Sequence, residues 1–377
     1  MRGKPTIFLL HSEISYYRLP LFEELSKRFY LHVYFCQVKS KKRLWTTSLD
    51  GYSFRNTVLR SINIGPLIIN YSLPLYLLRE KYDVYIIDDD PRLVFSKLIT
   101  VIFAKFFGKK IVVWEEATEK GQYNKIKDII VRYVFYPVRT LIFKKADAFI
   151  AWGKETQRFL IKCGIPENKI YLTTEGISKD QIMYGLDKGG IDKEKLKAEK
   201  GFHNKKVVLF VGYFSKRKGV VELIKAFKNL KRDDSVLVMV GAGEEERFLR
   251  SLASGSNNIF FTGYLDGMEK AIYYSLADIF VLPSFVDPWS LAIVEAMFFG
   301  LPIITTEGVG GKEAIDGNGI VIQPGDVDSL EKAINELLND DELRKKMSYR
   351  SKKLAEEHTI DRIVQDFVKA IETVYDE

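Results

Sequence analysis

The sequence predicts an α/β protein with two doubly wound parallel sheets, and three observations point to this fold class. At 377 residues the chain exceeds one ordinary hydrophobic core, so two domains of about 150–200 residues are expected. Short β-rich apolar runs alternate with helical patterns, which is typical of parallel strands joined by crossover helices. The pattern restarts after residues 178–204, a polar, Gly- and Lys-rich stretch that we interpret as a linker with a solvated helix.

The first half reads as a series of strands and crossover helices. Strands are expected at 5–10, 31–36, 83–88, 110–114, 147–151 and 169–173, and helices at 18–28, 91–107, 124–144 and 154–163. In the second half, helices separate strands expected at 206–211, 235–240, 258–261, 278–282, 302–305 and 319–322. The last helix, 361–375, has a one-sided apolar stripe and no strand after it, so we expect it to cross back to the first domain.

These elements divide the chain into residues 1–177 with 360–377, and residues 178–359. Ligands of doubly wound sheets bind beyond the carboxyl ends of the strands. If two such domains face each other, their strand ends meet across a cleft. We therefore expect the functional residues to stand where strands end.

Composition and charge narrow the functional classes. Cys36 and Cys163 are too few for a disulfide framework, so a reducing compartment is expected. The first apolar run is of strand length, so no signal peptide is expected, and prolines and asparagines interrupt 61–78, so no membrane-spanning helix is expected. Residues 1–180 carry 30 Lys and Arg against 18 Asp and Glu, while the remainder is acidic. Aromatic-basic RNA motifs and Cys/His finger spacings are missing, which disfavours nucleic acid and favours an anionic membrane face.

Two segments add to the membrane interpretation. Residues 93–114 and 126–145 are apolar with spaced Lys and Arg. Buried crossover helices explain most of this pattern, but the aromatic-basic mixture also suits a helix lying in a membrane interface. We therefore expect the protein to bind peripherally to a membrane surface.

The first strand end of the second half carries a basic turn. The strand VVLFVG ends at Gly212, and Lys216, Arg217 and Lys218 precede Gly219 and a helix. Cations and free N–H groups at a helix start suit an anion, although a solvated turn explains the lysines equally well. The next strand ends in GAGEE, where Gly243 allows close backbone approach to a flat or phosphorylated group.

Two acids stand at the next strand end. Asp287 lies in the loop SFVDPW, and Glu295 lies inside the apolar helix SLAIVEAMFFG. A carboxylate buried without donors is costly, so Glu295 needs partners. A ribose diol offers two hydroxyl donors, and an ion pair with a Lys or Arg is the alternative.

The first half also places polar residues at strand ends. Asp88-Asp89-Asp90 contains an Asp-x-Asp pattern, but Asp90 precedes Pro91 at a helix start, which favours a capping role over metal binding. His11 and Glu115 follow two predicted strands, and both strand ends point to the expected cleft. These residues either contact the acceptor or have surface and capping roles.

Residues 205–338 resemble the carboxyl-terminal domain of retaining glycosyltransferases of the GT-B fold, specifically the large family four, the group 1 glycosyl transferases. The resemblance rests on the basic-Lys-Gly loop, on Pro283-Ser284, Asp287-x(7)-Glu295, Ala296-Met297, Gly300 and Pro302, and on GY at 263–264, GVGG at 308–311 and IQPGD at 322–326. The amino-terminal stretch HSEISYYRLPLFEEL resembles a subgroup that begins with Tyr-Arg-x-Pro-Leu-Phe.

The resemblance implies roles for these residues. Lys218, Arg217 and Asp287 would carry the catalysis, the two cations on the donor diphosphate and Asp287 on the transferred sugar. The donor would also meet Gly212, Lys216, Gly243, Trp289, Ser290, Leu291 and, through its ribose, Glu295. The amino-terminal domain would bind the acceptor, with His11, Arg18 and Glu115 on that side. The donor phosphate itself would take the acceptor proton, and neither metal nor cofactor would be needed.

The resemblance thus implies transfer of a sugar from a UDP- or GDP-sugar to a glycan or lipid-linked acceptor, in polysaccharide or glycoconjugate synthesis at the cytoplasmic face of the membrane. Three positions depart from the family pattern: Asp287 replaces Glu, Tyr213 replaces Arg and Ser290 replaces Gly. Two alternatives stay open, namely a nucleotide-sugar 2-epimerase and a catalytically silent binding subunit.

Overall fold

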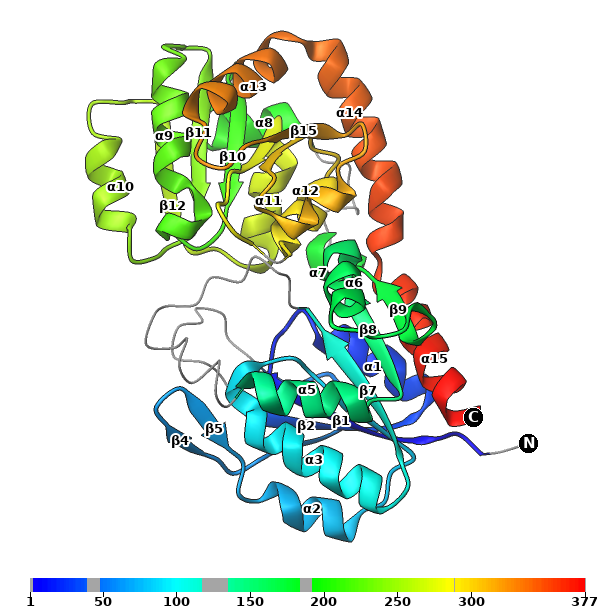
Figure 1. Ribbon diagram of the computed structural model, residues 1–377. Coiled ribbons are helices and arrows are strands. Elements are labelled where there is room, and N and C mark those ends of the chain that lie inside the picture. Colours follow the sequence, from blue (N-terminus) through cyan, green and yellow to red (C-terminus); the bar gives the residue numbers. More distant parts are fainter. Residues whose placement is uncertain (1–2, 39–47, 117–134, 184–191, 288, 377) are drawn as a thin grey trace. The chain divides into compact units, whose positions relative to one another are not determined.

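The computed structural model describes residues 3–38, 48–116, 135–183, 192–287 and 289–376. The chain divides into two compact units, each with its own sheet and core (Figure 1). Unit 1 contains residues 1–174 and 360–377, and unit 2 contains residues 175–359. Both units are α/β, as predicted from the alternation of strands and helices.

Unit 1 is built on a parallel sheet. Within the described residues its strand order is β3-β2-β1-β6-β7-β8-β9. The strands are β1 (Thr6–Glu13), β2 (Tyr30–Gln37), β3 (Arg55–Val58), β6 (Val84–Ile87), β7 (Lys110–Glu115), β8 (Ala148–Trp152) and β9 (Ile170–Thr173). A separate antiparallel hairpin consists of β4 (Ile62–Ile64) and β5 (Leu67–Ile69). The order reverses direction at β1 and β6, so the carboxyl ends of these strands flank the switch point where ligands of such sheets bind.

The helices of unit 1 pack on this sheet and on one another. They are α1 (Leu19–Arg28), α2 (Leu73–Arg79), α3 (Val94–Phe106), α5 (Tyr136–Lys145), α6 (Gly153–Lys162) and α15 (Ile360–Asp376). Helix α15 returns to unit 1 and packs against α1, β8 and β9 (Figure 1). Its predicted apolar stripe is buried at Ile363, Val364, Phe367 and Ile371, and Asp366 accepts a hydrogen bond from Thr173 of β9 at 3.0 Å.

Unit 2 repeats the architecture. In its described part the strand order is β12-β11-β10-β13-β14-β15, all parallel. The strands are β10 (Lys206–Val211), β11 (Ser235–Val240), β12 (Ile259–Gly263), β13 (Ile279–Leu282), β14 (Ile303–Thr306) and β15 (Gly319–Ile322). The helices are α7 (Lys179–Met183), α8 (Lys193–Glu199), α9 (Val220–Asn229), α10 (Glu246–Leu252), α11 (Gly267–Leu276), α12 (Leu291–Phe298), α13 (Val327–Asn339) and α14 (Asp341–Ala355).

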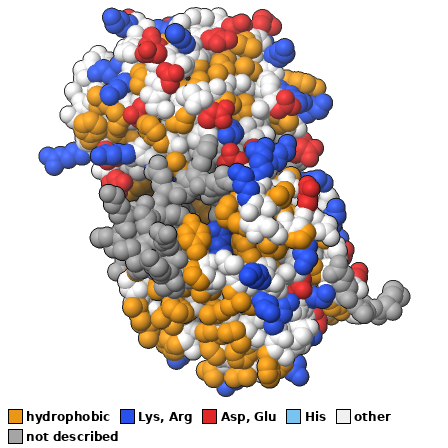
Figure 2. Space-filling view, viewed as in Figure 1, with side chains coloured by type: hydrophobic (Ala, Val, Ile, Leu, Met, Phe, Trp, Pro, Cys, Tyr) orange, Lys and Arg blue, Asp and Glu red, His pale blue; other side chains and the backbone are white. Residues whose placement is uncertain are grey.

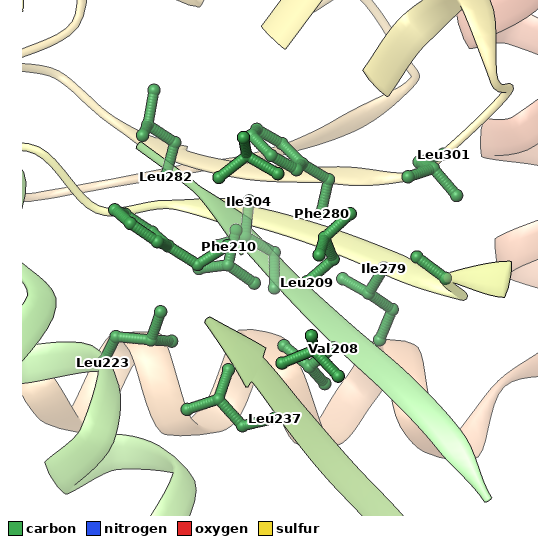
Figure 3. Close-up of a cluster of buried hydrophobic side chains, with 14 of the residues drawn as sticks. Val208, Leu209, Phe210, Leu223, Leu237, Ile279, Phe280, Leu282, Leu301 and Ile304 are labelled. Atoms are coloured by element: carbon green, nitrogen blue, oxygen red, sulfur yellow. The ribbon is translucent and has the colours of Figure 1, made fainter. Parts of the chain in front are cut away.

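The core of unit 2 lies on the central strands. Leu209, Phe210, Ile279 and Phe280 of β10 and β13 are fully buried, and Leu223 of α9 lies among them (Figure 3). Strands covered on both faces read as continuous apolar runs, which is why the sequence located them to within a residue or two.

Several elements differ from the prediction. The strands β3, β4 and β5 and the helix α2 were not expected. Strand β3 is a short polar edge strand. Pro74 stands in the first turn of α2, where a proline is compatible with the helix. Helix α8 forms in the expected linker, but Lys197 is buried and pairs with Asp278 at 2.9 Å, so the helix is not simply solvated. Part of the helix expected at 124–144 lies outside the described residues.

Helix length bears on how this chain meets a membrane. Among the described residues, every helix is either too short or too polar to cross a bilayer.

Candidate active site

Gly219 fixes the basic turn that follows β10. The turn Lys216–Lys218 leads through Gly219 into α9. The φ angle of Gly219 is +66°, and a Cβ atom there would lie 2.0 Å from the carbonyl oxygen of Pro283. Both the left-handed backbone and the close approach require glycine. The basic turn is thereby held against the loop after β13, where the Phe285 amide donates to the Arg217 carbonyl at 2.8 Å.

Asp287 lies against the cations of that turn. Lys218 Nζ donates to Asp287 Oδ2, and Arg217 Nη1 lies 3.5 Å from Asp287 Oδ1. The Asp287 backbone is anchored on both sides, because its amide donates to the Gly308 carbonyl at 3.0 Å and its carbonyl accepts from the Gly310 amide at 2.8 Å. The residues implied for the diphosphate and for the sugar are therefore direct neighbours. A phosphate entering here would compete with Asp287 for the same two cations.

Glu295 is buried on α12 and satisfied by α11. Its Oε1 accepts from Lys270 Nζ at 2.8 Å, and its Oε2 accepts from Tyr274 OH at 2.7 Å. Lys270 also lies 3.8 Å from Asp266 at the start of α11. The ion pair expected as the alternative to ribose binding is thus present. This ion pair does not use all the hydrogen-bond acceptor sites of Glu295, because a carboxylate group has about four lone-pair sites and can accept further hydrogen bonds.

The start of α12 presents backbone N–H groups next to Asp287. Ser290 is the N-cap residue, but its side chain makes no capping hydrogen bond, and Leu291 begins the helix. The indole Nε1 of Trp289 is buried without a hydrogen-bond partner in the described part of the chain. Uncapped N–H groups at a helix start are the ordinary protein partners of an anion.

The remaining donor-side candidates occupy the loops after β10 and β11. A Cβ atom at Gly243 would lie 2.3 Å from the Phe214 carbonyl oxygen, so the protein's own backbone already requires glycine there. Gly241 likewise abuts the carbonyl of Gly212. Lys216 is exposed at the start of the basic turn. The two glycine-bearing loops are therefore packed against one another, which accounts for glycine without any ligand.

Unit 1 gathers its candidates around Trp114. His11 stacks on the Trp114 ring, with centroids 5.3 Å apart, and its Nδ1 lies 3.2 Å from Asp88 Oδ2. The Arg18 guanidinium lies 5.1 Å from the Trp114 ring centroid and pairs with Glu116 at 2.8 Å. His11 and Arg18 are thus brought together at the carboxyl ends of β1 and β7.

Glu115 faces a separate small cavity. Its Oε1 lies 2.9 Å from Arg139 Nη2 of α5. The cavity between α3, α5 and the ends of β6 and β7 is lined by Asp88, Asp89, Lys97, Glu115, Arg139 and Phe143, among others. Desolvation, together with the carboxylates of Glu115 and Glu116, raises the pKa of Asp89 well above its usual range. Glu115 therefore belongs to a buried network of like and opposite charges, which Asp88 connects to His11.

The Asp-x-Asp pattern is split between different tasks. Asp90 is the N-cap of the turn Pro91–Leu93, where its side chain accepts from the Arg92 amide at 2.9 Å, as the capping interpretation predicts. Asp88 instead accepts from the Ser12 amide at 2.7 Å, which ties the end of β6 to β1. The first and last acids of the pattern thus have separate partners.

Sequence reasoning missed the two partners of Glu295. Lys270 and Tyr274 stand one helical turn apart on α11, but that spacing is common on any helix. Nothing in the sequence says that α11 lies beside α12. Because a buried acid needs a partner, the sequence predicts that Glu295 has one, but it does not show which residue that partner is.

Known proteins that this chain resembles include glycosyltransferases. Residues 192–354 match the family model described as Glycosyl transferases group 1. An uncharacterized glycosyltransferase of Methanocaldococcus jannaschii is 30% identical over 300 residues, which span 74% of each chain. The O-antigen chain mannosyltransferase C of Escherichia coli is 32% identical over 174 residues, which span 44% of this chain and 46% of that protein.

A solved structure shares the fold of the whole chain. The crystal structure of Anabaena HepE in complex with UDP superposes with a TM-score of 0.77 at 17% identity, covering 98% of this chain and 100% of that one. This likeness confirms the fold predicted from the sequence.

Proposed function

The chain belongs to the group 1 glycosyltransferases, and we propose that it transfers a sugar, with retention of configuration, from a nucleoside diphosphate sugar to a glycan or lipid-linked acceptor. The observation that carries the proposal is the cluster of Lys218, Arg217 and Asp287 beside the start of α12. It combines cations, uncapped helix N–H groups and a carboxylate at the carboxyl ends of parallel strands, where such sheets bind ligands.

The chemistry follows from the charges. As the bond between the anomeric carbon and the donor phosphate oxygen breaks, negative charge grows on the leaving diphosphate. Lys218 and Arg217 stabilise that charge where it develops, together with the N–H groups at residues 289–291. The acceptor oxygen bonds to the same face of the anomeric carbon, and its proton passes to the departing phosphate oxygen. Asp287, released from Lys218, is then placed to contact hydroxyl groups of the transferred sugar.

We propose that the nucleotide of the donor is UDP or GDP. HepE was crystallised with UDP, and the Escherichia coli relative is named for mannose transfer to an O-antigen chain. These names support a nucleotide-sugar donor and a role in polysaccharide or glycoconjugate synthesis for this chain. On the acceptor side we propose His11, Arg18 and Glu115, which stand at the carboxyl ends of β1 and β7 or just beyond.

Incubation with a panel of nucleotide sugars tests the proposal. We expect release of a free nucleoside diphosphate that an acceptor stimulates, measured by a coupled diphosphate assay. An epimerase would instead return an isomerised donor, and a silent subunit would bind nucleotide without turnover. Either result would overturn the transferase proposal.

We also propose that no metal is required, because Lys218 and Arg217 already supply the positive charge that a divalent cation would supply to the diphosphate. Activity should therefore survive EDTA at a concentration that inactivates a metal-dependent control enzyme. Complete loss on chelation, restored by Mn²⁺ or Mg²⁺, would show that the charge of the basic turn is insufficient.

Finally, we propose a cytoplasmic location with peripheral attachment to the inner face of the membrane. The support is the charge of residues 1–180, which carry 30 Lys and Arg against 18 Asp and Glu. Anionic lipid attracts each nearby cation by about 1 kcal/mol.

A further inference from the structure

Unit 1 carries a continuous exposed apolar surface. It consists of Ile62 and Ile64 of the β4–β5 hairpin, Leu75 and Leu78 of α2, and Ile102 and Phe106 of α3. The elements touch one another, since α3 packs against both α2 and β5. Hydrophobic side chains gather over these elements (Figure 2). Exposed apolar residues on ordinary surfaces are scattered singly, whereas a contiguous group of them marks an interaction site. We call these six residues the apolar face.

The side chains of the apolar face project into solvent. Phe106 is 81% exposed, Leu78 62% and Ile64 58%. Leu75 and Leu78 of α2 and Ile102 and Phe106 of α3 lie outside the helix faces that bury Leu77, Val101 and Ala104 in the core of unit 1. Both helices are therefore apolar on two sides, which the core of unit 1 does not require.

Positive charge predominates around the apolar face, where Glu80 after α2 pairs with Arg55 and Asp147 after α5 pairs with Lys105 of α3. Residues 62–79 and 94–106 contain no Asp or Glu. Exposed cations stand at its borders, at Arg60, Arg79 and Lys81 around α2 and at Lys144 and Lys145 at the end of α5, which packs against α3. None of the five forms an ion pair within the described part of the chain. Apolar side chains bordered by unpaired cations are complementary to a lipid bilayer, which has an apolar acyl-chain region beneath anionic headgroups.

We propose that the apolar face is the surface by which this protein lies on an anionic lipid bilayer, with Ile102 and Phe106 entering the acyl boundary and the bordering cations meeting lipid phosphates. This inference rests on the peripheral location proposed above and names the part of the chain responsible. A second copy of the chain is the weaker occupant. In a two-fold dimer the face would meet itself and bring its unpaired cations near one another.

Vesicle flotation with the full chain tests the proposal. The probes are vesicles of phosphatidylcholine with and without about 30 mol% phosphatidylglycerol, at low and high salt. We expect binding to the anionic vesicles that weakens with salt. Ile102→Glu with Phe106→Glu should lower that binding at least about tenfold, because two carboxylates would have to enter the interface.

The matched control is Phe248→Glu on α10 of unit 2, a residue 54% exposed and outside the apolar face. It should bind vesicles like the unchanged chain, and thermal unfolding should show both variants folded. Equal binding by the double variant would overturn the apolar face while leaving the location intact, and no binding by the unchanged chain would overturn both. A dimer in solution that the double variant abolishes would assign the face to a second copy instead. Sugar transfer to a water-soluble acceptor reports separately on the proposed function.

Discussion

Lys218→Ala should lower the turnover of sugar transfer by about 100-fold or more while leaving a folded protein, because removal of one preorganised donor to a developing charge costs about that much. The structure sharpens this expectation. Lys218 is the cation that donates to Asp287, so its loss removes the proposed diphosphate ligand and also leaves Asp287 with Arg217 at 3.5 Å. Turnover at saturating donor, measured by released nucleoside diphosphate, is the quantity to compare.

The control for that variant is Lys225→Ala, which removes an exposed cation on α9 just beyond the basic turn. It should leave turnover unchanged. Because Lys218 and Asp287 share one ion pair, the double variant with Asp287→Asn should lose less than the sum of the two single losses in free energy. Near-normal turnover in folded Lys218→Ala would sink its assignment to the diphosphate, whatever the double variant does.

The fold was accessible from the sequence where burial was complete. Residues of β10 such as Val208 and Phe210 are shielded on both faces of the sheet, so their strand reads as an unbroken apolar run. The edge strand β3, Arg55–Val58, has no such run, because its residues are partly or fully exposed. Register and packing partners, in contrast, are set by contacts between segments distant in the chain.

For the candidate site, too, the sequence predicted local positions but not the contacts between distant segments. Strand ends and motif spacing put Lys218 and Asp287 in the loops after β10 and β13 and Glu295 inside the helix that follows, and the structure has them at these positions in the chain. The spacing could not show that Lys218 pairs directly with Asp287, since 69 residues separate them. The sequence also could not predict that Lys270 pairs with Glu295, because only the packing of α11 beside α12 brings the two residues together.

Glu295→Gln should weaken binding of the sugar-free nucleoside diphosphate by about 1–3 kcal/mol, because one good acceptor for the ribose hydroxyls is lost. Asp287→Asn should instead leave nucleotide affinity unchanged or raise it, since it frees Lys218 from a competing carboxylate, and should lower transfer. Calorimetric titration of UDP and GDP into both variants measures the difference. If Asp287→Asn abolishes nucleotide binding and Glu295→Gln does not, the two roles are reversed.

Glu295 also has a structural task, which the experiment has to separate from ribose binding. Lys270 and Tyr274 bind its carboxylate, and loss of one partner from a buried ion pair costs about 3–5 kcal/mol of stability. Tyr274→Phe is the matched control, because it removes one hydrogen bond to Glu295 and keeps the carboxylate. The decisive comparison is UDP against 2′-deoxy-UDP, or the GDP pair if the chain binds GDP. The unchanged chain and Tyr274→Phe should both prefer the ribonucleotide, and Glu295→Gln should lose that preference. A variant that is less stable yet keeps the full preference would confine Glu295 to its pair with Lys270.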